Sequence, residues 1–270
     1  MNIAFIGGGN MASAIIGGLL QKGWRADAIR VAEIDPAARA RLERDLGVAA
    51  FADAGAALAG SQCLVLAVKP QQLREAARTL RGALASQLII TIAAGIRSSD
   101  LSRWLGNYPR IVRAMPNTPA LVLAGVSGLY AMPAVSAADR AQAEQIMGAV
   151  GATLWLESED QMDAITAVSG SGPAYVFYFI EALQQAAAEL GFPPATARKL
   201  ALDTFAGAVK LAAASGEDAA TLRARVTSKG GTTERALALL ETENTRQIIV
   251  RAVRAAAQRS RELGNELGGD

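Results

Sequence analysis

Short apolar runs alternate with longer helix-like segments over roughly the first 155 residues of the chain. The runs that predict strands are Asn2–Ile6, Ile29–Glu33, Val48–Phe51, Cys63–Val68, Leu88–Ile92, Arg110–Arg113, Gly125–Tyr130 and Thr153–Leu156. The segments that predict helices are Asn10–Gln21, Pro36–Leu46, Gln71–Leu80, Ser99–Trp104 and Ala137–Val150. Strands that alternate with helices in this way indicate βαβ units and a mostly parallel sheet.

The chain after Glu157 has a different pattern, in which the β-like runs stop and long stretches rich in Ala, Leu, Glu, Arg and Gln follow. These stretches predict helices over Asp160–Val168, Pro173–Leu190, Ala195–Ser215, Ala219–Val226, Thr233–Leu240 and Thr245–Glu266, with breaks at Ser169–Gly172, Gly191–Pro194 and Ser228–Gly231. We therefore expect an α/β domain over residues 1–157 and an all-helical domain over residues 158–270.

Composition removes several kinds of chemistry, because the 270 residues include no histidine and one cysteine, Cys63. Without histidine the chain cannot build a Ser-His-Asp or Cys-His site, a zinc or haem site held by histidine, or a histidine general acid. We expect no metal site. Cys63 lies in an apolar run and is expected to be a small buried hydrophobe. Any proton that the protein moves must come from another side chain, from the substrate or from water.

Charge and hydropathy favour a soluble globular protein. The formal net charge is +2, with Lys and Arg spread along the chain, so no basic tract indicates nucleic-acid binding. The start of the sequence has no basic leader, and no apolar run approaches the ~20 residues of a membrane span. A lone cysteine is compatible with a reducing compartment, and we expect a cytoplasmic protein with no membrane partner.

The first predicted strand runs into a glycine turn. Gly7, Gly9 and Ala12 match the G-x-G-x-x-G/A pattern of dinucleotide-binding Rossmann domains. Gly7 would permit the tight turn, Gly9 would let the backbone approach a pyrophosphate, and the helix that follows would offer unpaired N–H groups to the anion. A tight βα turn without a ligand would give the same pattern. With the predicted elements, the motif favours a doubly wound Rossmann domain.

The second predicted strand ends at Glu33, about 20 residues beyond the glycines, where an acidic side chain typically accepts hydrogen bonds from the adenine ribose. A carboxylate there repels a 2′-phosphate and favours NADH over NADPH. Arg39 or Arg41, on the next predicted helix, could turn back and compensate. A solvated charge at a strand end is the alternative interpretation of Glu33.

Two further strand ends belong to the same crevice, because ligands of doubly wound sheets bind at the carboxyl ends of the strands. Lys69 follows a buried strand and would lie near the ribose and phosphate of a cofactor, although Lys69-Pro70 could equally be a plain strand end with a proline opening the next helix. Ala93 and Ala94 follow another strand and are small enough for a ring to lie against the backbone.

Five motifs together resemble one enzyme family. They are Gly7–Met11, Ala67–Pro70, Arg113–Pro119 (RAMPNTP), Ser169–Tyr175 (SGSGPAY) and Val226–Thr233 (VTSKGGTT). In this order they strongly resemble pyrroline-5-carboxylate reductase, the last enzyme of proline biosynthesis. The resemblance runs from about residue 2 to about residue 262, almost the whole chain.

The resemblance implies a Rossmann domain followed by an all-helical domain that forms a homodimer, with dimers often assembled into larger rings. It implies transfer of a hydride from NADPH or NADH to the C=N carbon of L-1-pyrroline-5-carboxylate, giving L-proline. The implied cofactor residues, together with Glu33, are Ile6, Gly7, Gly8, Gly9, Asn10, Met11, Ala67, Val68, Lys69, Pro70, Ala93 and Ala94. The implied substrate residues are Glu159, Ser228, Gly230, Gly231, Thr232 and Thr233, with Thr233 as the catalytic residue.

The loop from Ser228 to Thr233 also makes chemical sense from its residues alone. It is a glycine-containing turn before a predicted helix, so its N–H groups can converge on an anion such as the substrate carboxylate. The Thr233 hydroxyl can bind the imine nitrogen or can simply cap the helix.

Two positions depart from the pattern that we expect of the family. Lys229 stands where the loop would carry proline, and it is either solvated and incidental or strengthens carboxylate binding. Glu33 stands where a polar or basic pair would receive the 2′-phosphate of NADPH. We therefore expect NADH to be at least usable.

A histidine is not needed for this reaction, because a cyclic imine can carry its own proton as an iminium and hydride delivery then neutralises it. Catalysis would rest on proximity and orientation. Two other functions compete with this one. A β-hydroxyacid dehydrogenase needs a base, which that family supplies as a lysine in the first helix of its second domain, and Pro173–Leu190 contains none. A nucleotide-binding sensor without turnover needs no carboxylate-binding loop.

Overall fold

The computed structural model describes residues 1–269. Two compact units can be distinguished: the first consists of Met1–Ser171 together with the end of the chain from Ala256, and the second of Gly172–Ala255. Helix α12 (Thr245–Gly268) thus begins in the second unit and ends in the first. The compact units divide the chain at Ser171, so the functional division at residues 157 and 158 stays a prediction.

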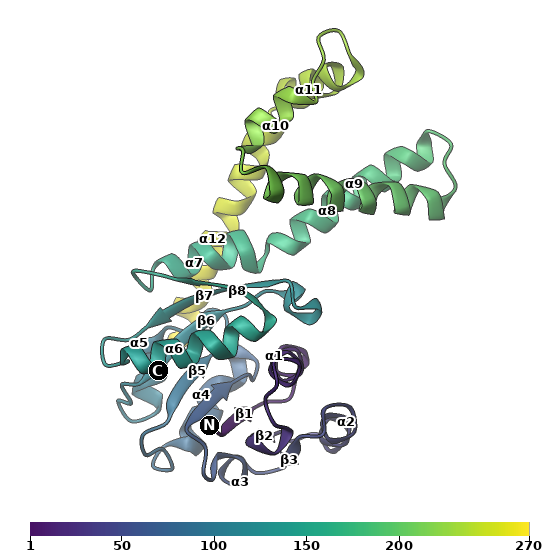
Figure 1. Ribbon diagram of the computed structural model, residues 1–270. Helices are drawn as coiled ribbons and strands as arrows, with labels where there is room; N and C mark the ends of the chain where they lie inside the picture. Colours follow the sequence, from purple (N-terminus) through teal and green to yellow (C-terminus); the bar gives the residue numbers. More distant parts are fainter. Residues whose placement is uncertain (270) are drawn as a thin grey trace. The chain divides into compact units, whose positions relative to one another are not determined.

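The first unit is built on one eight-stranded sheet in the order β3-β2-β1-β4-β5-β6-β7-β8 (Figure 1). The strands are β1 (Ile3–Ile6), β2 (Ile29–Ala32), β3 (Ala49–Phe51), β4 (Cys63–Leu66), β5 (Leu88–Thr91), β6 (Ile111–Met115), β7 (Gly125–Ala131) and β8 (Gly151–Trp155). Neighbours run parallel except β6 and β7, which are antiparallel. The predicted mostly parallel, doubly wound sheet is confirmed, and the order reverses between β1 and β4, where such sheets bind their ligands.

Helices cover both faces of this sheet. They are α1 (Asn10–Gln21), α2 (Pro36–Leu46), α3 (Ala54–Leu58), α4 (Pro70–Leu80), α5 (Ser98–Trp104) and α6 (Ala137–Met147). Side chains alternate along β1: Ile3 and Phe5 pack with α1, α2 and α6, whereas Ala4 and Ile6 pack with α3, α4 and α5. The central strands β1, β4 and β5 are therefore buried on two sides, which explains their nearly continuous apolar sequences.

Every predicted helix is present, but the sequence pattern missed several short elements. These are α3 and the 3₁₀ turns Ala26–Ala28 and Thr118–Val122, while the end of the helix predicted over Ala137–Val150 is a 3₁₀ turn, Gly148–Val150. The predicted break at Ser169–Gly172 is shorter than expected, because only Ser171 of these four residues lies outside a helix. Helix α7 (Gln161–Ile165) continues into a π-helical turn, Thr166–Gly170, and α8 (Gly172–Glu189) begins after Ser171. The turn closes with a hydrogen bond from Ser171 N to Thr166 O at 2.8 Å.

The second unit is entirely helical. It contains α8, α9 (Pro194–Ser215), α10 (Ala219–Arg225), α11 (Thr232–Thr242) and the first part of α12, and α8 and α9 lie side by side as a helical hairpin (Figure 1). Several large apolar side chains are exposed within it, among them Phe177, Tyr178, Val209 and Leu239. No helix in the described part of the chain is long and apolar enough to span a membrane.

Candidate active site

The glycine turn between β1 and α1 leaves room for a phosphate. Gly7 has φ +98°, and a Cβ at this position would lie 2.8 Å from the carbonyl oxygen of Ala67, so only glycine fits. A Cβ at Gly9 would meet no protein atom within 4 Å. Gly9 is also the N-cap of α1 and provides no side-chain cap, so the first N–H groups of the helix remain available to an anion. The turn therefore fits a dinucleotide pyrophosphate.

Glu33 follows β2 and reaches the glycine turn. Its Oε2 accepts a hydrogen bond from Gly8 N at 2.8 Å, and its Oε1 accepts one from Asp35 N at 3.0 Å. The carboxylate is therefore held in place and is not a freely solvated charge at a strand end. Arg39 turns back to the same loop, where Nη1 donates to the carbonyl oxygens of Glu33 at 2.7 Å and Ile34 at 3.0 Å. A carboxylate and a guanidinium are thus held at the same loop.

The predicted cofactor residues lie at one edge of the sheet, because they follow the carboxyl ends of four neighbouring parallel strands, β2, β1, β4 and β5. Ala67 N donates to Ile6 O at 2.8 Å, which joins the ends of β1 and β4. Lys69 is exposed and is the N-cap residue of α4, with Pro70 as the first helical residue. The remaining predicted cofactor residues are Gly7, Gly8, Gly9, Asn10 and Met11 after β1, Glu33 after β2, Val68 after β4, and Ala93 and Ala94 after β5.

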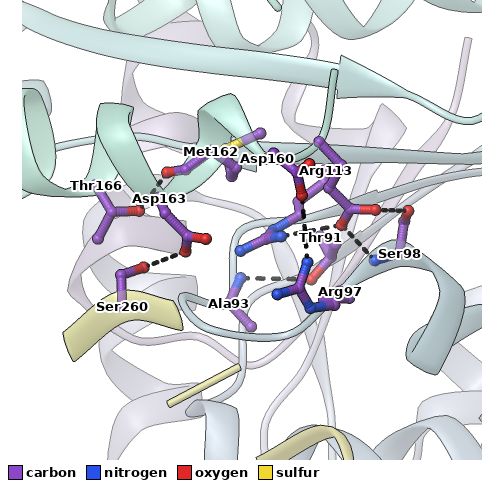
Figure 2. A network of polar contacts seen from close by, with 11 residues as sticks. Thr91, Ala93, Arg97, Ser98, Arg113, Asp160, Met162, Asp163, Thr166 and Ser260 are labelled. Carbon is purple, nitrogen blue, oxygen red and sulfur yellow. Dashed lines mark hydrogen bonds and ion pairs between the residues drawn. The ribbon is translucent and has the colours of Figure 1, made fainter. Parts of the chain in front are cut away.

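Glu159 belongs to the first unit, and its carboxylate is already bound by Ser98 and Arg113, two residues that Figure 2 labels. Oε1 accepts hydrogen bonds from Ser98 N at 2.6 Å and Arg113 Nη1 at 2.9 Å, while Oε2 accepts one from Ser98 Oγ at 2.6 Å. The sequence prediction placed Glu159 beside the substrate, and that role stays a prediction. Its partners Ser98 and Arg113 were missed, although a charged residue inside the apolar strand β6 is a signal that could have found Arg113.

The loop from Ser228 to Thr233 lies in the second unit, and the structure changes the expectation for its N–H groups. Gly230 has φ +73°, and its N–H donates to Glu234 Oε2 at 2.6 Å. Gly231 N donates to Ser228 O at 3.0 Å. The N–H groups of Gly230 and Gly231 thus have partners within the chain, so the expectation that the N–H groups of this loop converge on an external anion stays a prediction only for the other residues of the loop.

The two threonines open α11 and do not cap it. The N-cap is Gly231, with no side-chain cap hydrogen bond, and Thr232 and Thr233 are the first two helical residues. The capping alternative is therefore wrong for both hydroxyls. The N–H groups of these two residues have no intrahelical acceptor, since the first turn of a helix leaves them unpaired. Lys229 is exposed beside them.

Two motifs that the sequence prediction quoted without assigning a role meet in the first unit. Asn117, in the RAMPNTP motif, donates from Nδ2 to the carbonyl oxygen and the Oγ of Ser169, each at 3.2 Å, and accepts from Val126 N at 2.8 Å. A Cβ at Gly170 would lie 2.7 Å from Cε of Met115. Asn117 and the absence of a side chain at Gly170 therefore fix the π-helical turn, which explains why Ser169 and Gly170 stay helical.

Metal chemistry and thiol chemistry find no support in the described residues. Within residues 1–269, no three His, Cys, Asp or Glu side chains come together to hold a metal ion. Cys63 is fully buried in β4, and burial raises the pKa of its thiol far above the usual range. The thiol therefore stays neutral and serves as a packing residue.

A surface hollow of about 910 Å³ lies at the opposite edge of the sheet, beside the beginning of β1. Its lining includes Lys22, Trp24 and Arg25 after α1, with Asp139 and Gln142 of α6. Ligands of doubly wound sheets bind at the carboxyl ends of the strands, so this hollow is on the wrong edge for the cofactor.

Comparisons with known proteins match the two parts of the chain to two family models and the whole chain to one group of enzymes. The model for pyrroline-5-carboxylate reductase dimerisation matches residues 159–263, and the model for NADP oxidoreductase, coenzyme F420-dependent, matches residues 2–95. The pyrroline-5-carboxylate reductase of Pseudomonas aeruginosa is 45% identical over 267 residues, which is 98% of each chain. That of Haemophilus influenzae is 42% identical over 97% of each chain.

Two solved structures extend the similarity to the fold. A pyrroline-5-carboxylate reductase from Coxiella burnetii has a TM-score of 0.92 at 42% identity, with 97% of this chain and 98% of that chain covered. The Plasmodium falciparum pyrroline carboxylate reductase, solved with NADP bound, has a TM-score of 0.88 at 27% identity, with 98% of both chains covered.

Proposed function

We propose how this chain binds its cofactor and substrate from the premise that it belongs to the pyrroline-5-carboxylate reductase family. It reduces L-1-pyrroline-5-carboxylate to L-proline in proline biosynthesis, and its amino-terminal domain binds NADP. This assignment sets aside both a β-hydroxyacid dehydrogenase and a sensor without turnover. The structural observation that carries it is the open glycine turn at Gly9, next to Glu33, at the switch point of the sheet.

The cofactor is proposed to bind along the carboxyl ends of β1, β2, β4 and β5. The N–H groups at the start of α1 would hold the pyrophosphate, and Glu33 and Arg39 would meet the adenine ribose. Lys69 supplies a positive charge beside the ribose and phosphate. Ala93 and Ala94 are small enough for the nicotinamide to lie against their backbone. Because Glu33 can accept hydrogen bonds from ribose hydroxyls, we also propose that NADH is usable.

The chain's own residues need to orient the substrate more than to move a proton. When bound, the reduced nicotinamide supplies the hydride. The imine nitrogen can already carry a proton, so the chain needs no strong general acid, which agrees with the absence of histidine. We propose that the N–H groups of Thr232 and Thr233, with Lys229 nearby, bind the substrate carboxylate, and that the Thr233 hydroxyl binds the ring nitrogen. Ser228, Gly230 and Gly231 shape this loop.

A homodimer is proposed from the exposed apolar side chains of the second unit. The family model for dimerisation covers 159–263, and Phe177, Val209 and Leu239 are all more than half exposed in the single chain. Dimers are proposed to assemble further into a ring. Sedimentation analysis should give a mass of twice 28.0 kDa or a higher even multiple. A monomer at micromolar concentration would contradict the proposal. A cytoplasmic location stays a prediction.

The experiment that tests the function is an absorbance assay of reduced nicotinamide with the purified chain. Consumption of NADPH on addition of L-1-pyrroline-5-carboxylate is expected, and Thr233→Ala should lower kcat while Thr233→Ser keeps it. If Thr233→Ala leaves both kcat and the KM for the substrate unchanged, the role assigned to this hydroxyl is wrong.

A further inference from the structure

The ion pair between Glu159 and Arg113 is buried in the first unit, at the end of the sheet where the cofactor is proposed to bind; Figure 2 shows Arg113 in this region. The Arg113 side chain is 5% exposed and the Glu159 side chain 17%. Charges withdrawn from water in this way are stable only when hydrogen bonds of good geometry replace their hydration. Both Glu159 oxygens meet that condition through Ser98 and Arg113. The pair is therefore a fixed feature of the fold rather than a mobile surface contact.

What Glu159 holds is the turn between β5 and α5, residues 92–97. At the start of this turn, Ala93 N donates to Thr91 Oγ1 at 3.4 Å. At its end, Glu159 binds both the N–H and the hydroxyl of Ser98, the first residue of α5. Arg113 on β6 is the register partner of Thr91 on β5. The ion pair and the start of the turn therefore lie on neighbouring strands at the same level of the sheet. Side chains thus hold both ends of the turn, Thr91 at its start and Glu159 at its end.

The end of α12 packs against the same turn from another direction. Gly95 has φ +74°, and a Cβ placed there would lie 3.4 Å from Cβ of Leu263. A Cβ on Gly264 would likewise lie 3.4 Å from the carbonyl oxygen of Gly95. Ser260, also in α12, donates to Asp163 Oδ1 of α7 at 2.6 Å, as Figure 2 shows. The turn is thus held both by Glu159 and by α12. A substitution at Ser98 must therefore either move the backbone of the turn or be compensated by the contacts between the turn and α12.

We propose that Glu159 is a positioning residue for the cofactor: with Arg113 it fixes Ser98, and through Ser98 it sets the backbone of Ala93 and Ala94 that receives the nicotinamide. This inference rests on the proposed function, which places the nicotinamide at these two alanines. It moves Glu159 from the substrate side, where sequence resemblance put it, to the cofactor side. Ser98 and Arg113 would then also help to position the cofactor, although neither needs to contact it.

The test compares two ligands that differ only at the nicotinamide: NADP⁺ and 2′-phospho-ADP-ribose. Calorimetry on the Ser98→Ala variant should show NADP⁺ binding about tenfold weaker, since a hydrogen bond to a charged carboxylate is lost, while the fragment binds within about twofold of the parent protein. Ser98→Thr, which keeps the hydroxyl, should restore NADP⁺ binding. Ser102→Ala, on the same helix, is the matched control and should change neither affinity.

A role in overall stability alone would weaken both ligands together, and that result overturns the proposal. Unchanged NADP⁺ affinity in Ser98→Ala overturns it too. Glu159→Gln, with its exposed neighbour Glu157→Gln as control, adds a second reading: the effects of Glu159→Gln and Ser98→Ala on NADP⁺ affinity should not add. If Glu159→Gln instead raises only the KM for pyrroline-5-carboxylate, Glu159 is a substrate ligand. Should Glu159→Gln not fold, the Ser98 variants decide alone.

Binding of NADP⁺ and of its fragment is measured without substrate, so this test is independent of turnover. An inactive parent protein would contradict the proposed function. The affinities for NADP⁺ and for 2′-phospho-ADP-ribose would still show whether Ser98 positions the turn.

Discussion

Glu33 Oε2 accepts a hydrogen bond from the backbone N–H of Gly8 at 2.8 Å, so the acid that ends β2 contacts the glycine turn that ends β1. The same carboxylate would accept hydrogen bonds from a ribose diol and would repel a 2′-phosphate. We therefore predict that the choice between NADH and NADPH depends on Glu33, whose carboxylate also holds Gly8 in the glycine turn.

Replacing Glu33 by serine removes the negative charge and keeps a hydroxyl for the ribose. The ratio of kcat/KM for NADPH to kcat/KM for NADH should rise about tenfold, because one charge repulsion is lost. Steady-state kinetics with both cofactors checks this. A ratio that stays constant would show that Glu33 does not face the 2′ position.

Arg39 is expected to offset Glu33, since its guanidinium lies on the same loop. Arg39→Met should lower kcat/KM for NADPH more than for NADH, whereas Arg41→Met, an exposed arginine of the same helix, should change neither. Equal losses from the two variants would mean that a general positive field, rather than Arg39 itself, attracts the phosphate.

A substitution at Gly9 should affect cofactor binding without affecting folding. Gly9→Val should leave the Tm nearly unchanged, because a Cβ there meets no protein atom within 4 Å, yet it should abolish NADPH binding by filling the phosphate position. Gly7→Ala is the contrasting variant. It should lower the Tm, because φ is +98° and the added Cβ would lie 2.8 Å from Ala67 O. Calorimetry and thermal unfolding measure the two effects, and tight NADPH binding by Gly9→Val would contradict the cofactor site.

Lys229 and Glu234 are expected to act oppositely on the substrate. Glu234 Oε2 holds Gly230 N and places a negative charge near the proposed carboxylate site, so Glu234→Gln should lower the KM for pyrroline-5-carboxylate. Lys229→Met should raise it by a few-fold, with kcat nearly unchanged. An unchanged KM for Lys229→Met would return Lys229 to an incidental surface role.

Asp139 should contribute stability that depends on pH. Burial would raise the pKa of this carboxyl, but hydrogen bonds from Arg110 and Ser136 outweigh burial and hold the pKa below its ordinary value of 3.8. A carboxyl whose pKa is lowered by folding stabilises the protein above its unfolded pKa, and this stabilisation is lost as the pH falls through the folded pKa. Asp139→Asn should therefore cost about 1–3 kcal/mol at pH 7 and progressively less below about pH 4.

Urea denaturation at the two pH values measures this difference. Asp53→Asn is the matched control, because the exposed Asp53 caps α3 without a cation and asparagine caps a helix equally well. A cost for Asp139→Asn that does not change with pH would place the stabilisation in packing rather than in charge.

The fold could be predicted because its signals are local. Buried strands flanked by helices define the doubly wound sheet, and once parallel strands are recognised their carboxyl ends must share an edge. This brought Gly9, Glu33, Lys69 and Ala93 to one side of the sheet without any knowledge of contacts. The α3 helix was missed because its five residues are too short to show a period.

The contacts of the site could not be predicted in the same way, because they join residues far apart in sequence. Arg113 and Glu159 are 46 positions apart, and nothing local pairs them. The π-helical turn depends on Asn117, which is 52 positions from Ser169. In the loop from Ser228 to Thr233, Gly230 N donates to Glu234, which is only four residues away. This hydrogen bond depends on the geometry of the Glu234 side chain, which the glycine pattern does not predict.

The most direct test of the central claim follows the hydride itself. The purified chain is incubated with L-1-pyrroline-5-carboxylate and NADPH deuterated at the transferable C4 position, and the product is analysed by mass spectrometry. The account predicts L-proline carrying one deuterium at C5, with one NADP⁺ formed for each proline. Unlabelled proline, or no consumption of NADPH by a chain that binds it, would contradict the account.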